Sequence, residues 1–240
     1  MIDKIRSSIV YSDPFDHIII DNFFDIELAN KLSEQFPVDA GYLYSYNNKI
    51  EVKQVCNHWD RFPKETYNVF WNFCSKDFTD ALSQKFNNIS LCPDITLHGA
   101  GWHIHKSGGK LNIHQDYVTH PKINYKRKLN LLVYLSKEWD SSWNGGLQLW
   151  SHDDKNNRPK NLIKTINIKF NRAVIFDTTQ NSWHGLPDTI CCPANLSRKS
   201  LAMYYLIPTN EASRNRALFV PTKEQEEDPE VLSFISERLK

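Results

Sequence analysis

The segment at residues 111–116 (LNIHQD) carries two side chains of types that bind metal ions. His114 and Asp116 are two positions apart, so both point to the same face if the segment is a β-strand. A third ligand must come from elsewhere, and His184 is the natural candidate because it follows a strongly apolar segment at residues 172–177. Two histidines and one carboxylate leave one face of an octahedron open, which favours Fe(II) with a bidentate co-substrate and O2 over structural zinc.

The His-x-Asp pair is a weak signal on its own, because surface loops contain it by chance and about 10% of isolated pairs would bind a metal. His103 and His105 form a second same-face pair, but no carboxylate stands at the adjoining position. We rank that pair as an alternative metal site below the first. The five cysteines fit no zinc pattern, and the adjacent Cys191 and Cys192 cannot act like a Cys-x-x-Cys motif.

The elements that must position these ligands follow residue 90, where short segments are separated by Gly, Asn, Pro and Asp. Several of them alternate apolar and polar residues or are rich in β-branched and aromatic side chains, which is typical of strands. About eight short strands joined by turns indicate a sandwich, a jelly roll or a barrel. The expected strands are residues 94–105, 111–117, 129–136, 146–150, 162–170, 172–177, 182–186 and 199–206.

Before residue 90 the pattern is mainly helical. A short strand at residues 16–24 precedes a helix near 26–36, and apolar residues recur at helical period over 62–87. A charged helix is expected at 228–239. Helices packed on one sheet give a workable two-layer domain, so the predicted fold class is α+β, mainly β.

Five stretches in consecutive order together resemble one enzyme family. They are HKSGGKLNIHQD at 105–116, RKLNLLVYLSKEWD at 127–140, GGLQLW at 145–150, NRAVIFDTTQNSWHGL at 171–186 and RKSLAMYYL at 198–206. The region 94–206 resembles the prolyl-hydroxylase-like branch of the 2-oxoglutarate/Fe(II) oxygenases. The resemblance implies a double-stranded β-helix (jelly roll) core, with the N-terminal helices on one sheet, and His114, Asp116 and His184 as the iron ligands.

The resemblance also implies a basic residue that holds the far carboxylate of 2-oxoglutarate, and Arg198 occupies that position. A guanidinium suits the task because it pairs bidentately with a carboxylate and stays charged. Ser200 shares the face of Arg198, and Tyr134 matches a family tyrosine that reaches the same carboxylate. His105 stands where many relatives have a tyrosine. The stretch between His184 and Arg198 is longer than usual in the family, so Lys199 is kept as the reserve anchor.

The implied reaction is hydroxylation of an unactivated C–H bond with Fe(II), 2-oxoglutarate and O2, and with ascorbate as a supporting reductant. Asp116 is intact, whereas related halogenases lack this carboxylate, so hydroxylation is favoured over halogenation. The expected substrate is a prolyl residue or another amino-acid-like molecule, by analogy with the fold. The loops 117–128 and 151–161 are expected to hold it, with Tyr117, Arg127 and Trp183 as the substrate contacts.

Three other functions stay open at this stage. The chain could be a metal-binding jelly roll without oxygenase activity, or a hydroxylase of a small metabolite rather than a peptide. A cupin-like enzyme without a co-substrate is the third, and its activity would not depend on Arg198.

Composition excludes some classes of partner and compartment. The 240 residues carry 29 basic and 28 acidic side chains, so we expect no nucleic-acid face and interpret the run 126–128 as a solvated loop. No stretch approaches the ~20 apolar residues of a membrane span. Five cysteines fit reduced thiols in a cytoplasmic protein. We expect one domain over 1–240: supporting elements at 1–90, the β core at 91–206 and an extension at 207–240. The oligomeric state stays open.

Overall fold

The computed structural model describes residues 1–87, 89–210 and 216–239. Thirteen strands are named over these ranges: β1 (His17–Ile20), β2 (Tyr44–Asn47), β3 (Glu51–Cys56), β4 (Cys92–Pro93), β5 (Gly101–His105), β6 (Lys110–Gln115), β7 (Tyr125–Tyr134), β8 (Leu147–Asp153), β9 (Arg158–Ile166), β10 (Arg172–Asp177), β11 (Trp183–Leu186), β12 (Arg198–Pro208) and β13 (Leu218–Phe219). The helices are α1 (Ile2–Ser7), α2 (Ile26–Glu34), α3 (Lys64–Phe73), α4 (Lys76–Lys85) and α5 (Pro229–Glu237).

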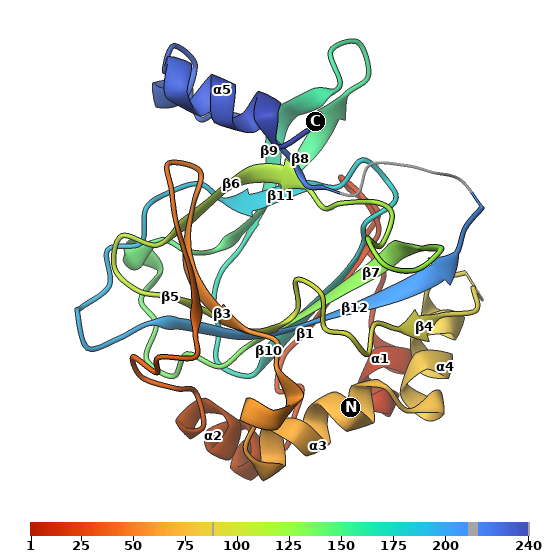
Figure 1. Cartoon of the computed structure of the whole chain (residues 1–240). Coiled ribbons are helices and arrows are strands. Elements are labelled where there is room, and N and C mark those ends of the chain that lie inside the picture. Colours follow the sequence, from red (N-terminus) through yellow and green to blue (C-terminus); the bar gives the residue numbers. More distant parts are fainter. Residues whose placement is uncertain (88, 211–215, 240) are drawn as a thin grey trace.

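The strands form one curled antiparallel sheet in the order β1-β10-β7-β12-β5-β3-β6-β11-β8-β9, with β2, β4 and β13 attached at its sides. Strands β6 and β11 lie across from β7, β10 and β12 (Figure 1). From β5 to β12 the consecutive strands alternate between the two walls, except that β8 and β9 form a hairpin within one wall; this is the arrangement of a jelly roll. The predicted mainly β fold class is confirmed.

The N-terminal helices α1–α4 cover the outer face of the wall that contains β7, β10 and β12, and α5 lies at the opposite end of the molecule (Figure 1). Aromatic side chains join these helices to the sheet: Phe70 and Phe73 of α3 and Phe78 of α4 are fully buried, and Phe78 stacks on Tyr205 of β12. This apolar layer covers the outer face of the wall and leaves its inner face for polar side chains.

The C-terminal segment at residues 217–225 runs along the strand that carries His114. Phe219 of β13 pairs with His114, Val220 donates its backbone N–H to the carbonyl of Ile113, at 3.0 Å, and the side-chain amide of Asn112 donates back to the carbonyl of Val220. Strand β6 therefore lies between β11 on one side and β3 with β13 on the other, although neither β13 nor its pairing is apparent from the sequence.

Several predicted boundaries are wrong. The helix expected at 62–87 is two helices, because Cys74 ends α3 and the hydroxyl of Ser75 caps α4. The strand expected at 94–105 begins only at Gly101; the residues before it form turns. Strands β2 and β3, in the part expected to be mainly helical, were not predicted. Among the described residues, no helix is long and apolar enough to cross a membrane.

Candidate metal centre

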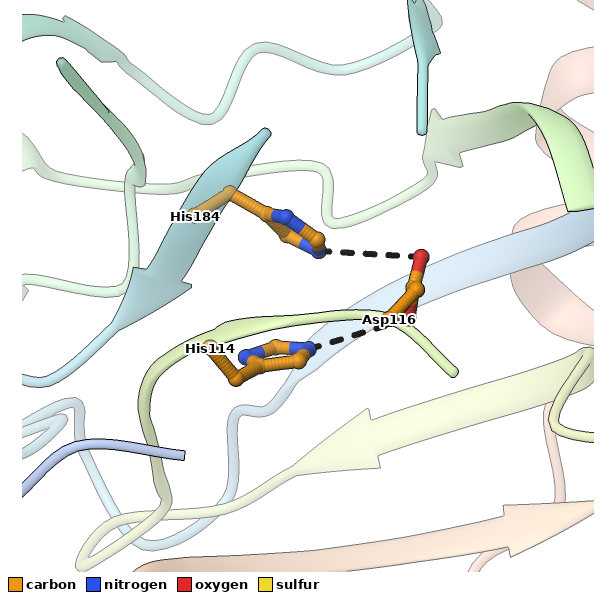
Figure 2. Close-up of side chains that lie close together, drawn as sticks. All are labelled: His114, Asp116 and His184. Atoms are coloured by element: carbon orange, nitrogen blue, oxygen red, sulfur yellow. Dashed lines mark ion pairs between the residues drawn. The ribbon is translucent and has the colours of Figure 1, made fainter. Parts of the chain in front are cut away.

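Neighbouring strands bring the three predicted ligands together. His114 of β6 pairs directly with His184 of β11, and their ring centroids are 4.4 Å apart. Asp116 lies one residue beyond the end of β6 and faces both rings: its carboxylate oxygens lie 3.8 Å from Nε2 of His114 and 3.9 Å from Nε2 of His184 (Figure 2). One ligand atom from each residue lies within 4.8 Å of the others, and all three side chains are buried.

Gly185 allows the two strands to approach this closely. A Cβ at this position would lie 2.8 Å from the backbone oxygens of both Leu111 and Asn112, closer than real Cβ contacts. Backbone atoms cannot move aside as a flexible side chain can, so any larger residue would push β11 away from β6. The short distance between His184 and His114 therefore depends on the glycine at position 185.

Backbone hydrogen bonds fix the orientation of both imidazoles. Nδ1 of His114 lies 3.0 Å from the carbonyl of Asn112, and Nδ1 of His184 lies 2.8 Å from the carbonyl of Ser182. A carbonyl only accepts, so Nδ1 carries the proton and Nε2 keeps its lone pair toward the centre. Burial, together with the neighbouring His184, lowers the pKa of His114 to about 3. Burial also lowers the pKa of His184.

Asp116 is held as a carboxylate. Burial would raise the pKa of Asp116, but the nearby charge of Arg127 and the two imidazoles lower it to about 2. Oδ1 accepts a hydrogen bond from the phenol of Tyr204 at 3.1 Å, and Oδ2 accepts one from the amide of Asn130 at 3.2 Å. Two neutral imidazoles and one ionised carboxylate are the protonation states that a divalent metal requires of its ligands.

The predicted co-substrate anchor lies on the opposite wall of the same cavity. Arg198 is 2% exposed; its Nε donates to the carbonyl of Gly145 at 2.9 Å and its Nη1 to the hydroxyl of Ser200 at 3.3 Å. Its guanidinium lies over the ring of Tyr134 at 5.0 Å. Among the described residues no carboxylate neutralises this buried charge.

Two further buried polar groups surround Arg198. His105 lies opposite Arg198 across β5 and β12, and neither of its ring nitrogens has a hydrogen-bond partner in the described part of the chain. The phenol of Tyr134 is buried beside the same guanidinium. Buried polar groups are almost always satisfied in folded proteins, so these atoms, beside an uncompensated guanidinium, fit a dicarboxylate ligand. The two imidazoles and the carboxylate of the triad are the set of ligands that non-haem Fe(II) oxygenases use, so the triad fits Fe(II).

A cavity of about 640 Å³ joins the triad to the anchor. Besides the three ligands, Arg198, Ser200, His103 and His105 line it. Of the predicted substrate contacts, Tyr117 and Arg127 also line the cavity, and Trp183 does not. Trp183 is fully buried on the other face of β11 from His184. There its indole N–H donates to His152 at 2.9 Å, and its ring stacks on that imidazole.

Sequence reasoning missed the residues that support the ligands. Asn130 lies in the apolar run LNLLVY of β7. A single amide among aliphatic residues of a buried strand could have indicated a polar contact at the site. Tyr204 was hidden among other large residues of β12. Lys53 and Glu51 of β3 line the cavity as an ion pair at 2.9 Å, but nothing in the sequence links them to this site. Lys199, the reserve anchor, points away and donates to the carbonyl of Ser33.

Comparison with known proteins agrees with this site. The family model described as the 2OG-Fe(II) oxygenase superfamily matches residues 100–206. Mouse prolyl 3-hydroxylase OGFOD1 is 25% identical over 200 residues, which are 82% of this chain and 34% of that protein. The chain therefore spans about a third of the length of this curated relative.

Solved structures share the fold at low sequence identity. A Trichoplax adhaerens prolyl hydroxylase in complex with a peptide fragment of the hypoxia inducible factor oxygen degradation domain is 15% identical, with a TM-score of 0.53 over 85% of this chain and 86% of that one. HygX from Streptomyces hygroscopicus, solved with nickel, 2-oxoglutarate and hygromycin B, is 9% identical, with a TM-score of 0.53 over 82% and 84%.

The curled antiparallel sheet with a buried triad of two histidines and an aspartate is the architecture of a non-haem Fe(II) oxygenase. Residues 100–206 match the model of the 2OG-Fe(II) oxygenase superfamily, and the chain is similar to a prolyl hydroxylase, so both comparisons support this class.

Proposed function

We propose that this protein is an Fe(II)- and 2-oxoglutarate-dependent dioxygenase that hydroxylates a prolyl residue or another amino-acid-like substrate. One observation carries the proposal: a buried, metal-ready triad and a buried, uncompensated Arg198 face the same cavity. A metal site alone would not need the guanidinium. A co-substrate with two carboxylates, one at the metal and one at the far wall, uses both.

Each residue has a defined task in this proposal. His114, Asp116 and His184 would hold the iron, and Arg198 with Ser200 would hold the far carboxylate of 2-oxoglutarate. When bound, Fe(II), 2-oxoglutarate and O2 supply the oxidation that turns a C–H bond into C–OH, and the co-substrate is decarboxylated to succinate. The protein orients the reactants and excludes bulk water, and ascorbate would support the enzyme as a reductant.

The prolyl residue leads among substrates because the mouse relative is a prolyl 3-hydroxylase and the Trichoplax enzyme was solved with a peptide. HygX, with hygromycin B bound, keeps a small molecule as the competing class. Tyr117, the first residue of the loop 117–128, lines the cavity. We therefore expect this loop to bind either kind of substrate.

Succinate release tests the proposal. The protein is incubated with Fe(II), 2-oxoglutarate, ascorbate and O2, with proline-containing peptides, free amino acids and small metabolites in separate arms. We expect metal-dependent succinate formation that increases with one substrate class and is lost in His114→Ala. His58→Ala is the matched control, because His58 is an exposed histidine outside the cavity.

Two outcomes would contradict the proposal. Binding of metal with no succinate in any arm, even without hydroxylated product, would make the chain a non-catalytic metal-binding module. Turnover that is unaffected by Arg198→Ala would point to a cupin-like enzyme that uses no 2-oxoglutarate.

We also propose a cytoplasmic location. Cys56, Cys74, Cys92, Cys191 and Cys192 are all free thiols, and proteins that keep five reduced cysteines are typical of reducing compartments. Fractionation with alkylation of free thiols in the cell would test it; recovery of the protein in an oxidising compartment would contradict it.

A further inference from the structure

Arg127 forms a buried ion pair with the carboxylate of the proposed iron ligand Asp116. Its Nη1 lies 3.1 Å from Oδ1 of Asp116, and the two side chains are 3% and 7% exposed. The sequence places Arg127 in a basic run that we interpreted as a solvated loop, with this arginine as a substrate contact. The structure buries it beside the triad instead, with its charge already engaged.

The guanidinium is held on both faces and through both terminal nitrogens. The rings of Tyr117 and Tyr204 cover its two faces at 3.4 and 3.3 Å from Cζ, and Nη2 donates to the carbonyl of His98 at 2.7 Å. Gly99, in the left-handed region at φ +74°, leaves room for the group, because a Cβ there would lie 2.7 Å from Nη2. So many constraints on one side chain indicate that its exact position matters.

The neighbours of Arg127 act on the same carboxylate oxygen. Tyr204, whose ring stacks on the guanidinium, donates its hydroxyl to Oδ1, so Oδ1 receives both Arg127 and Tyr204. Oδ2 accepts from Asn130 and lies 3.9 Å from Nε2 of His184, whereas Oδ1 lies 3.8 Å from Nε2 of His114. The two oxygens of Asp116 are therefore in different environments, and Oδ1 is the one that contacts the cationic guanidinium.

We propose that Arg127 is a positioning residue that keeps Asp116 bound to the metal through one oxygen only. A salt bridge to Oδ1 holds that oxygen back, so that Oδ2 serves as the ligand. A carboxylate that closed on the metal with both oxygens would occupy an extra coordination position. Three protein ligands must leave three positions for a bidentate co-substrate and O2, so Arg127 would preserve the open face on which the proposed function depends.

The test uses Co(II) as the metal and needs no turnover. The visible absorption of bound Co(II) reports the number and geometry of its ligands. Arg127→Gln removes the charge and keeps a polar side chain, and we expect it to change the position and intensity of the Co(II) bands. We also expect the affinity of the Co(II) protein for 2-oxoglutarate to fall by about 10-fold or more, as for other residues that support metal ligands.

Two further variants keep the test decisive if Arg127→Gln does not fold. Tyr204→Phe keeps the stacked ring and removes the second donor to Oδ1, so it should shift the same Co(II) bands in the same direction by a smaller amount. Arg172→Gln is the matched control, because Arg172 pairs with Asp21 at 2.6 Å, outside the cavity, and its Co(II) spectrum should equal that of the wild type.

A Co(II) spectrum that is unchanged in folded Arg127→Gln and in Tyr204→Phe would overturn the inference. That outcome is distinct from failure of the proposed function, in which the wild-type protein itself would bind no Co(II), or would bind it with no change on addition of 2-oxoglutarate. Circular dichroism and thermal unfolding identify the variants that are folded before their spectra are compared.

Discussion

Phe219 stacks on the imidazole of His114, with ring centroids 4.8 Å apart and planes inclined by 19°. The two residues also face each other across the β13–β6 pair. The C-terminal segment therefore contacts a proposed metal ligand directly, through the ring face and through the backbone ladder. Phe219 is 4% exposed, so its ring belongs to the wall of the site and not to the surface.

Phe219→Ala should destabilise the protein and loosen the metal site. Truncating a buried phenylalanine costs about 3–5 kcal/mol of unfolding free energy, and His114 would lose the surface that fixes its ring. Urea unfolding and Co(II) titration measure the two effects. Leu232→Ala, in α5 with 43% of the side chain exposed, is the control and should change stability by about 0.5 kcal/mol or less. Equal effects of the two variants would contradict the prediction.

Arg198→Ala should weaken binding of 2-oxoglutarate and spare the metal. Loss of a charge-assisted hydrogen bond costs about 1.5–3 kcal/mol, so the Kd for 2-oxoglutarate should rise about 10-fold to 100-fold. Lys199→Ala is the matched control, because its ammonium group donates to Ser33 on the other side of β12. Calorimetry of 2-oxoglutarate with the Co(II) protein checks both; an equal loss in the two variants would remove Arg198 from its assigned role.

Gly185→Ala should separate His184 from His114. The added Cβ would overlap backbone oxygens of β6 at 2.8 Å, so β11 must shift, and a misplaced ligand costs affinity. We expect at least about a 10-fold weaker Co(II) affinity, together with lower stability. Gly41→Ala is the control, since nothing lies within 4 Å of a Cβ there. Normal Co(II) binding by Gly185→Ala would show that the strands do not need this contact.

The stability of the fold should fall as the pH falls below 6.5, in part through His17 of β1. This histidine is fully buried, and burial lowers its pKa below the ordinary value of 6.5. The unfolded chain then takes up the proton more readily than the folded one, so the stabilisation is present above pH 6.5 and lost as the pH falls further.

His17→Gln tests this assignment. The loss of unfolding free energy between about pH 7.5 and pH 5.5 should be smaller in the variant by up to about 1.4 kcal/mol, the value of one pKa unit. Chemical unfolding at both pH values measures it. His58→Gln, at an exposed position, should keep the wild-type dependence. A pH dependence unaltered by His17→Gln would show that other buried groups account for all of it.

Short segments rich in apolar residues between turns were enough to predict the metal strand and most of the β core. This signal works for residues 111–116 and 172–177 because most of their side chains are buried on both faces. It fails where structure depends on distant partners. Strand β3 is polar, with only Glu51 and Cys56 buried, and β13 has two residues, so neither carries a periodic signal of its own.

The ligands were predictable and their supports were not. His114, Asp116 and His184 belong to a compact motif set, whereas Arg127 looks like any basic loop residue until Tyr117, Tyr204 and Gly99 surround it. A residue whose role is defined by neighbours from three other segments has no local signature. The burial of Arg127 is a property of the assembled sheet, and only the structure can report it.

The strand pairs around His114 have a consequence for the order of events during synthesis. Its partners, His184 on one side and Phe219 on the other, follow it by many residues in the chain. Domains fold as units while the ribosome adds residues from the N-terminus. A nascent chain that has been synthesised only as far as His184 still lacks Phe219, whose ring packs on His114. The site that would hold the iron is therefore complete only after Phe219 has been synthesised, and a ribosome stalled before Phe219 would carry the three candidate ligands without a finished site.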